Sequence, residues 1–212
     1  MAKGFTQIPG EDFTDSYSPV VNDITFRTML VVYMMWDFDT CVFDVETAFL
    51  TGDIDTRIYM ECPEGMEHAQ DEILLLQKTI YGLVQSARQY YKKFKEVMVE
   101  KLGFKCSRSD PCLFYKASDK GIVIVCMYVD DNWCIGHRAA IDDLLEEIQK
   151  HFNITIEEGL QDYLSCDIVV SKDRKRAWLG QPHMISRNYA RLLGMKCMVC
   201  PGIKPLVLQD LG

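Results

Sequence analysis

The sequence predicts an α+β fold in which antiparallel strands are backed by helices. Two apolar runs joined by a polar pair lie within 121–136 and are typical of a β-hairpin. The next segment, 138–152, is amphipathic, and its apolar residues share one helical face: Ile141, Leu144, Leu145, Ile148 and Phe152. A second helical pattern over 88–102 is followed by further strands. Hairpins and helices in this order favour an antiparallel sheet with helices packed against it.

The composition is that of an ordinary globular protein. The chain has 212 residues, of which 48% are hydrophobic and 25% are charged, enough for one large domain or two small ones. No segment reaches about 18 consecutive apolar residues, so we expect no membrane span and no membrane partner. The first ten residues lack the apolar centre of a signal peptide.

The cysteines number nine and are irregularly spaced. Four of them lie in apolar runs and are interpreted as buried thiols of a reducing compartment: Cys41, Cys126, Cys134 and Cys166. Cys197 and Cys200 form a single CxxC pair. A structural zinc site would need two more ligands, so the sequence disfavours zinc.

The net charge of −8 is awkward for a nucleic-acid binder, because affinity for phosphate comes largely from Lys and Arg. The basic residues are nevertheless clustered, over 88–95, 172–176 and 187–196. Each cluster is either a solvated face or a phosphate contact. The acidic excess indicates that this chain alone would bind nucleic acid weakly.

The first half of the chain is predicted to alternate helix and strand. Ser18 as N-cap and Pro19 at the first helical position predict a helix that continues to Met35. Strands are predicted over 41–45, 57–61 and 73–77. Ser86 can cap the helix over 88–102, and Gly103 ends it.

The second half is predicted to be richer in strands. Asp110-Pro111 turns the chain into a strand over 112–116, and a turn over 118–121 leads into the hairpin. A strand over 163–170 pairs with a second one over 176–181. The segment 182–193 is predicted to be a helix that ends at Gly194.

Three carboxylates stand at the ends of predicted strands. Asp130 and Asp131 join the two apolar runs of the hairpin, and Asp44 ends the run that begins at Cys41. The pair can be read simply as a turn, yet two-residue hairpin turns prefer Gly or Asn at their second position. Adjacent carboxylates repel each other unless a cation neutralises them, and Mg²⁺ favours carboxylates together with phosphates. Two-metal nucleotidyl transfer needs such a three-carboxylate cluster.

These residues carry a resemblance to a known family. Tyr128-Val129-Asp130-Asp131 resembles the active-site motif of reverse transcriptases, and the surrounding segments narrow the match to the polymerase of copia-type (pseudovirus) retrotransposons. The likeness covers residues 2–200 in six ordered blocks: AKGFTQ at 2–7, FTDSYSPVV at 13–21, FDVETAFLTGDIDTRIYMECPEGM at 43–66, IYGLVQSARQYYKKF at 80–94, GFKCSRSDPCLFYK at 103–116 and MYVDDNWCIG at 127–136.

The resemblance implies a right-hand polymerase architecture with partial fingers and little or no thumb. Residues 1–200 would form fingers and palm, with the palm core over 37–50 and 86–181. The fingers-like segments would be 1–36 and 51–85, and 201–212 would be a tail or the start of the thumb.

The resemblance also implies a chemistry, RNA-directed DNA synthesis. Asp44 and Asp130 would bridge two Mg²⁺ ions, for which Mn²⁺ could substitute. The Val45 carbonyl would help to hold the ion on the nucleotide side, and Asp131 would be a looser metal ligand. One ion would activate the primer 3′-hydroxyl, and pyrophosphate would leave on the other.

Further family positions concern the nucleotide and the primer. Phe49 matches the aromatic gate against a 2′-hydroxyl, and it can equally be a core residue. Tyr81, Gly82 and Gln85 match the loop that lines the nucleotide pocket, where Gly82 would permit close approach of the backbone. The primer grip would comprise Trp178, Leu179 and Gly180, although Trp178 can also be a half-buried strand aromatic.

The implied partners are an RNA or DNA template-primer, dNTPs, and the ribonuclease H and integrase segments of a parent polyprotein. The implied location is the cytoplasm, in a virus-like particle, or the nucleus. The chain departs from the family pattern at Val84, Ala87, Ser165 and Gly180. A decayed fragment that folds but does not polymerise is therefore an alternative, and a metal-binding structural module is a third reading.

Overall fold

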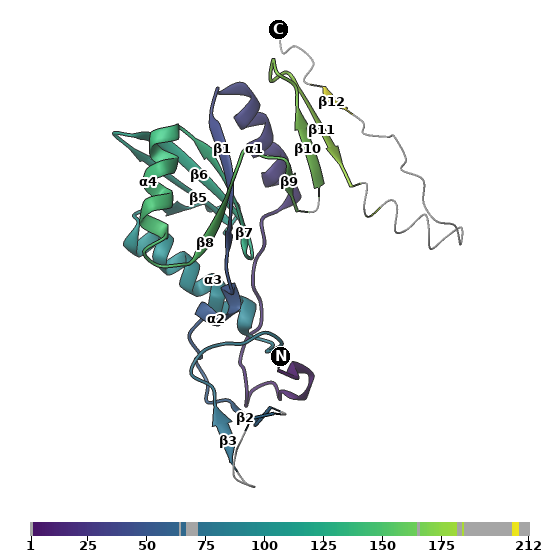
Figure 1. Ribbon diagram of the computed structural model, residues 1–212, viewed down its shortest axis with the longest axis vertical. Helices are drawn as coiled ribbons and strands as arrows, with labels where there is room; N and C mark the ends of the chain where they lie inside the picture. The colour runs from purple at the N-terminus through teal and green to yellow at the C-terminus, as the bar shows by residue number, and fades with distance from the viewer. Residues whose placement is uncertain are drawn as a thin grey trace, which may run out of the picture.

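The protein combines helices with antiparallel sheets, as the sequence predicts (Figure 1). The structure, a computed structural model, describes residues 2–63, 65–66, 72–164, 166–181, 184 and 205–207. Its helical elements are η1 (Gly4–Thr6), α1 (Asp23–Met35), α2 (Ala48–Thr51), α3 (Ser86–Glu96), the π-helical segment η2 (Val97–Lys101) and α4 (Arg138–Ile148). None of the helices in this part of the chain is long and apolar enough to cross a membrane.

The main sheet has six strands in the order β4-β5-β6-β7-β1-β8, and each neighbouring pair is antiparallel. Its strands are β1 (Asp39–Val45), β4 (Lys105–Cys106), β5 (Leu113–Ser118), β6 (Gly121–Tyr128), β7 (Asp131–Gly136) and β8 (Ile154–Glu158). The order inserts β1, the first strand in the chain, between β7 and β8. This insertion brings residues near 44 beside the hairpin at 128–131.

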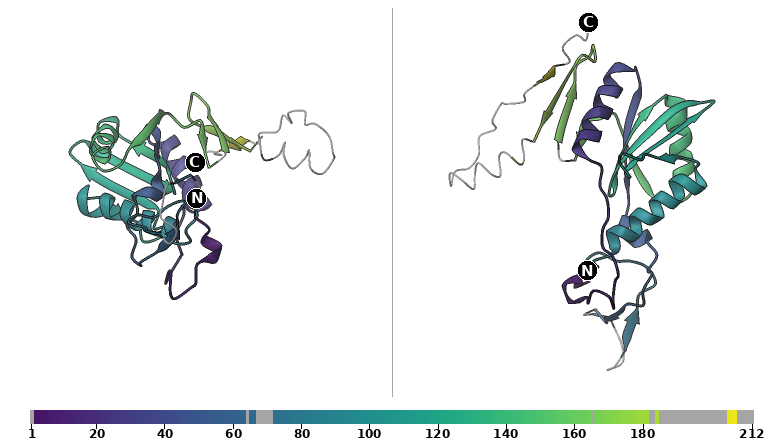
Figure 2. Two further views of the ribbon diagram at one scale, coloured as in Figure 1. Left: turned by 60° about the horizontal axis from the view of Figure 1, so that its bottom comes forward. Right: turned by 180° about the vertical axis from the view of Figure 1, so that it is seen from behind.

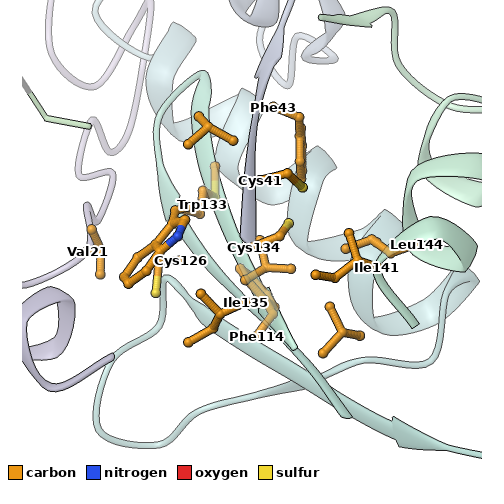
Figure 3. Packing of buried hydrophobic residues seen from close by; sticks show 14 of the residues in the cluster. Val21, Cys41, Phe43, Phe114, Cys126, Trp133, Cys134, Ile135, Ile141 and Leu144 are labelled. Carbon is orange, nitrogen blue, oxygen red and sulfur yellow. The ribbon is translucent and has the colours of Figure 1, made fainter. Parts of the chain in front are cut away.

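Helices cover both faces of this sheet. Trp133 of β7 faces α1, where its ring lies 5.4 Å from that of Phe26. Ile141 and Leu144 of α4 pack on the opposite face, and Figure 3 shows Trp133 and these two residues on different sides of the strands. The Trp133 indole Nε1–H donates to the Thr40 hydroxyl over 2.6 Å, so the one polar atom of this buried ring is paired.

The prediction of buried thiols is confirmed for three of the four cysteines and not for Cys166. Cys41, Cys126 and Cys134 are buried in the core and Cys166 is half-buried, and all four are free. Burial raises the pKa of the Cys126 thiol well above its ordinary value, which keeps it protonated.

A second sheet lies beside α1 (Figure 1, Figure 2). It contains β9 (Asp162–Tyr163), β10 (Cys166–Val170), β11 (Arg176–Gly180) and β12 (Pro205–Val207) in the order β12-β11-β10-β9. Hydrogen bonds, an Arg174–Asp37 ion pair and contacts of the Tyr163 ring with Phe26 and Trp133 join it to the rest of the protein. The Tyr163 hydroxyl donates to the Cys126 carbonyl over 2.8 Å, and the Arg174 guanidinium donates to the Phe38 carbonyl over 2.9 Å.

A two-stranded hairpin of β2 (Tyr59–Glu61) and β3 (Ile73–Leu75) lies at the lower end of the molecule in Figure 1, near the N-terminal segment. Both strands are shorter than the sequence predicts. The predicted end of the helix at Gly103 is confirmed: Leu102 is the C-cap, and Gly103 has a φ of +73° that glycine tolerates.

Two predicted helix starts are wrong. The first helix begins at Asp23, not at Pro19, and its N-cap is Asn22, whose side chain accepts from the Ile24 amide. The preceding residues are held in a tertiary connection instead, because the Val21 amide donates to the Met127 carbonyl. Ser86 does not cap α3 but lies within it, and its hydroxyl donates to the Ile80 carbonyl.

The single strand predicted over 163–170 is also wrong. The register pairs Cys166 with Tyr163, so β9 and β10 form a hairpin and the chain reverses between them. Leu164 has a φ of +56°, which ends the extended conformation there. The predicted partner over 176–181 is confirmed as β11. The predicted helix over 182–193 and the CxxC pair lie outside the described residues, apart from Met184.

Candidate active site

Two of the three carboxylates singled out in the sequence are direct cross-strand partners. Asp44 lies opposite Asp131 in the β1–β7 pair and opposite Thr155 in the β1–β8 pair. Directly opposed residues project from the same face of a sheet, so these side chains share one surface. That surface is an open cleft of about 270 Å³, lined by Val42, Asp44, Asp131, Thr155, Glu157, Tyr163 and Leu164.

The third carboxylate, Asp130, is at the tip of the β6–β7 hairpin. Tyr128 pairs with Asp131, so the two loop residues are Val129 and Asp130. The prediction of a turn at Asp130-Asp131 is therefore wrong by one residue, and Asp131 is the first residue of β7. Val129 has a φ of +55°, a conformation that a β-branched residue adopts only under strain.

The tip of this hairpin is tied to the end of β1. The Val45 amide donates to the Asp130 carbonyl over 3.0 Å, and the Asn132 side-chain amide donates to the same oxygen over 2.7 Å. The two donors come from different strands. The strained turn is thus held from both sides in one position.

The carboxylates act on one another electrostatically. The pKa of Asp44 is raised above its ordinary value, first by burial and then by the negative charges of Asp130, Glu46 and Glu157. A group in this setting is stabilised as a carboxylate by a nearby cation. The electrostatics therefore fit a metal ion.

The ligand geometry is less complete. Within the residues that the structure describes, no group of three or more His, Cys, Asp or Glu side chains is arranged to hold a metal ion. Mg²⁺ commonly takes only one or two protein carboxylates and completes its shell with water and phosphate oxygens. Asp44 with Asp130 or Asp131 could supply such a partial set.

The predicted nucleotide-pocket aromatics are brought together. The ring of Phe49 in α2 lies 5.1 Å from the ring of Tyr81, although 32 positions separate the two in sequence. Phe49 also lies 6.4 Å from Tyr90 of α3, in an edge-on arrangement. Phe49 is only partly buried and Tyr81 is 38% exposed, so the pair presents an aromatic surface.

Gly82 and Gln85 connect this loop to the N-terminal segment. Gly82 has a φ of +99°, and its carbonyl is packed so closely by Gly4 that any Cβ on Gly4 would overlap it. Gln85 is 1% exposed, and its side-chain amide bonds the Gln7 side chain and the Asp12 carbonyl. In this arrangement Gln85 holds the loop in place and does not face an open pocket.

The predicted primer-grip residues lie on β11. Val169 pairs with Trp178, Ile168 with Leu179 and Asp167 with Gly180. The Arg176 guanidinium lies 5.7 Å from the Trp178 ring centre. Trp178, Leu179 and Gly180 are each partly buried, and they are not among the residues that line the carboxylate cleft.

The family described as "Reverse transcriptase (RNA-dependent DNA polymerase)" matches residues 1–188. The chain belongs to the reverse transcriptase family. No solved structure matches it.

Curated relatives of the chain include Pol polyproteins of copia-type transposons. It is 37% identical, over 90% of its length, to the retrovirus-related Pol polyprotein from transposon TNT 1-94 of Nicotiana tabacum. It is 30% identical, over 89% of its length, to the Pol polyprotein from transposon RE1 of Arabidopsis thaliana. The chain covers only 15% and 13% of these two relatives.

Several residues around the candidate site were not singled out from the sequence. Thr155 and Glu157 come from β8, which was not predicted, although the alternating ITIEE run at 154–158 carries the signal. Asn132 and Tyr90 read as ordinary strand and helix residues, and only the tertiary structure places them behind the Asp130 turn.

Proposed function

We propose that this chain is the polymerase segment of a copia-type retrotransposon Pol polyprotein and that it transfers nucleotides from dNTPs to a primer 3′-hydroxyl on an RNA or DNA template. The observation that carries the proposal is the pairing of Asp44 with Asp131 across β1 and β7, with Asp130 at the adjoining turn, in a chain of the reverse transcriptase family.

The proposed metal ligands are Asp44, Asp130, Asp131 and the Val45 carbonyl, and the ions are two Mg²⁺ or, in their place, Mn²⁺. When bound, the ions would lower the pKa of the attacking hydroxyl and neutralise charge on the leaving oxygen. The chain itself supplies position and charge. Burial and repulsion from Asp130, Glu46 and Glu157 make an ionised Asp44 costly without a cation, which favours cation binding at this cleft.

The proposed nucleotide surface is the Phe49–Tyr81 pair. The two rings present apolar faces against which a sugar and a base can pack. A 2′-hydroxyl placed against Phe49 would lose its hydrogen bonds to water, which disfavours ribonucleotides. Gln85 contributes by fixing the loop through Gln7 and Asp12.

The proposed architecture assigns the six-stranded sheet with α3 and α4 to a palm, and the β2–β3 hairpin with the N-terminal segment to partial fingers. The proposed primer grip is Trp178–Gly180 on β11. Ribonuclease H and integrase segments would lie elsewhere in the parent polyprotein, and the proposed location is a cytoplasmic virus-like particle or the nucleus.

A second candidate function is a folded retroelement fragment that does not polymerise. The observation that favours it is the lack, within the described residues, of a three-residue metal-ligating group. Against it stand the Phe49–Tyr81 aromatic pair and the acidic cleft, which a merely folded fragment does not need.

The test is dTTP incorporation on poly(rA)/oligo(dT) with Mg²⁺, comparing the wild type with Asp130→Asn. Asp119→Asn is the matched control, because Asp119 is an exposed aspartate in the turn at the other end of β6. Removing a charged ligand should lower incorporation by about a hundredfold or more, since positioning and electrostatics supply most of the rate. The control should retain activity.

Two outcomes contradict the proposal. One is near-normal turnover by Asp130→Asn. The other is an inactive wild type that stays inactive when the chain is extended at both ends, which would favour the non-polymerising fragment.

A further inference from the structure

Two buried polar side chains lie behind the Asp130 turn, on the face of the sheet that carries α3. Asn132 of β7 and Tyr90 of α3 are both 0% exposed. Burying an amide and a hydroxyl without partners is unfavourable, so their remaining hydrogen-bonding atoms must be accounted for.

The Asn132 amide nitrogen is committed to two main-chain carbonyls. It donates to the Asp130 oxygen over 2.7 Å and approaches the Phe43 oxygen at 3.5 Å. Phe43 is also the cross-strand partner of Asn132. Because both neighbours are acceptors, the nitrogen must face them and the Oδ1 atom must point away. The Oδ1 atom is buried without a hydrogen-bond partner.

The Tyr90 hydroxyl is the complementary group. It too is buried without a hydrogen-bond partner. Burial and the charges of Asp130 and Asp44 raise the pKa of this hydroxyl, and the Asn132 side chain acts on it in the opposite sense and lowers it. No direct bond of ordinary length joins Tyr90 Oη to Asn132 Oδ1. One group has a spare donor, and the other has a spare acceptor.

The Tyr90 ring reaches in the other direction toward the nucleotide-side aromatics. Its centre lies 6.4 Å from that of Phe49, which in turn lies 5.1 Å from Tyr81. Tyr90 therefore packs its ring against Phe49 of the aromatic pair. Its hydroxyl is electrostatically coupled to Asn132, the side chain that donates to the Asp130 carbonyl.

We propose that Tyr90 and Asn132 are positioning residues for the catalytic turn, with one water bridging the Tyr90 hydroxyl and Asn132 Oδ1. This bridge fixes the Asn132 amide, which holds the Asp130 carbonyl and so orients the strained Val129-Asp130 turn. The inference rests on the proposed polymerase function. It adds two residues that touch neither substrate nor metal and that link the Phe49 surface to the carboxylates.

The test uses Asn132→Leu, Tyr90→Phe and their double variant. Tyr90→Phe removes only the hydroxyl, so it keeps the ring packing and remains usable if Asn132→Leu does not fold. Tyr91→Phe is the matched control, because Tyr91 is the next residue of α3 and its hydroxyl donates to the Pro111 carbonyl, away from the turn. Thermal unfolding of each variant reports the fold.

The kinetic readout is kcat and KM for dTTP on poly(rA)/oligo(dT). Misplacing a catalytic group should lower kcat by about tenfold to a hundredfold in Asn132→Leu, with KM changed by less than about threefold. Tyr90→Phe should show a smaller loss in kcat, and the double variant should be no worse than Asn132→Leu alone, because both changes break one chain of contacts. Tyr91→Phe should match the wild type.

The second readout does not depend on activity. Amide hydrogen exchange at Val129, Asp130 and Asp131 should accelerate by about tenfold in Asn132→Leu, while exchange at Val125 and Cys134, farther along the same hairpin, stays unchanged. If the wild type proves inactive even when the chain is extended at both ends, the proposed function fails, and this exchange measurement still decides the positioning role. Unchanged exchange at the turn in folded Asn132→Leu, or a kcat loss in Tyr91→Phe equal to that in Tyr90→Phe, overturns the inference.

Discussion

The backbone amide of Val45 donates a 3.0 Å hydrogen bond to the carbonyl of Asp130, one step beyond the last cross-strand pair of β1 and β7, Asp44 with Asp131. This bond joins a strand end to a hairpin tip that are 85 positions apart in the sequence. All three carboxylates of the candidate site are thereby held at one corner of the sheet. The strain of the hairpin turn and the ionisation of Asp44 both depend on this local arrangement.

The strain at the hairpin tip can be tested with Val129→Gly. Releasing a left-handed β-branched residue recovers about 1–3 kcal/mol, which offsets the entropy of a new glycine, about 0.5–1 kcal/mol, and the lost contacts. The free energy of unfolding in urea should therefore fall by less than about 1 kcal/mol. Val169→Gly, at a half-exposed position within β10, should cost more. A larger loss in Val129→Gly than in Val169→Gly would show that the turn is not strained.

The electrostatics of the cleft predict an unusual effect of Asp44→Asn. The raised pKa of Asp44 means that the folded protein binds more protons than the unfolded chain at pH values from 3.8 up to the folded-state pKa. The free energy of unfolding therefore falls as the pH rises through that window, and the ionised Asp44 side chain destabilises the fold at neutral pH. Without divalent cations, Asp44→Asn should resist urea better than the wild type at pH 7.

Added Mg²⁺ should reverse that order, because it stabilises the wild-type carboxylates and has less to bind in Asp44→Asn. Asp39→Asn, an exposed change at the start of the same strand, is the control and should behave as the wild type. If Asp44→Asn is less stable than the wild type in metal-free buffer, the account of the cleft is wrong.

The edge strand β8 is held to α4 by an ion pair with a predictable pH dependence. Arg138 bonds Glu158 through two nitrogens, at 2.6 and 2.8 Å, and lowers the pKa of the Glu158 carboxyl. The stabilisation is present above the unfolded pKa of Glu158 and is lost as the pH falls through the lower, folded value. The pair is exposed, so Glu158→Gln should cost less than about 1 kcal/mol at pH 7 and low salt.

The cost of Glu158→Gln should disappear in acid and shrink in high salt, as measured by urea unfolding. Glu146→Gln, an exposed change on α4, serves as the reference. A loss for Glu158→Gln that is independent of both pH and salt would rule out the ion pair as its cause.

The buried Gln85 predicts that the N-terminal segment is part of the folded unit. Gln85→Ala removes hydrogen bonds to the Gln7 side chain and the Asp12 carbonyl and leaves buried polar groups unpaired. The free energy of unfolding should fall by about 1–3 kcal/mol. Limited proteolysis should also cut within residues 2–14 faster than in the wild type. Gln149→Ala, an exposed change after α4, should affect neither measurement.

Local patterns account for the elements that the sequence predicted well. The apolar stripe of α4 and the apolar runs of β6 and β7 follow from short-range patterns, which are a property of neighbouring residues. The three candidate carboxylates could be identified from the sequence because they stand at the ends of such apolar runs.

Register and helix starts could not be predicted in the same way. The hairpin turn lies at Val129-Asp130, one residue before its predicted position, and places Val129 in a left-handed conformation. The turn is held there because the Val45 amide and the Asn132 side chain both donate to the Asp130 carbonyl. The first helix begins at Asp23 and not at Pro19, because the Val21 amide donates to the Met127 carbonyl instead of entering a helix. Such choices depend on partners that are distant in sequence.

The sequence by itself therefore determined the class of the fold, the family, and the identity of Asp44, Asp130 and Asp131 as candidates. Only the tertiary structure decided that β1 inserts between β7 and β8, that Asp44 faces Asp131, and that Tyr90 and Asn132 lie behind the turn. The physical reason is that periodicity records which face a residue takes within one element. Which elements then become neighbours is decided by packing of the whole core.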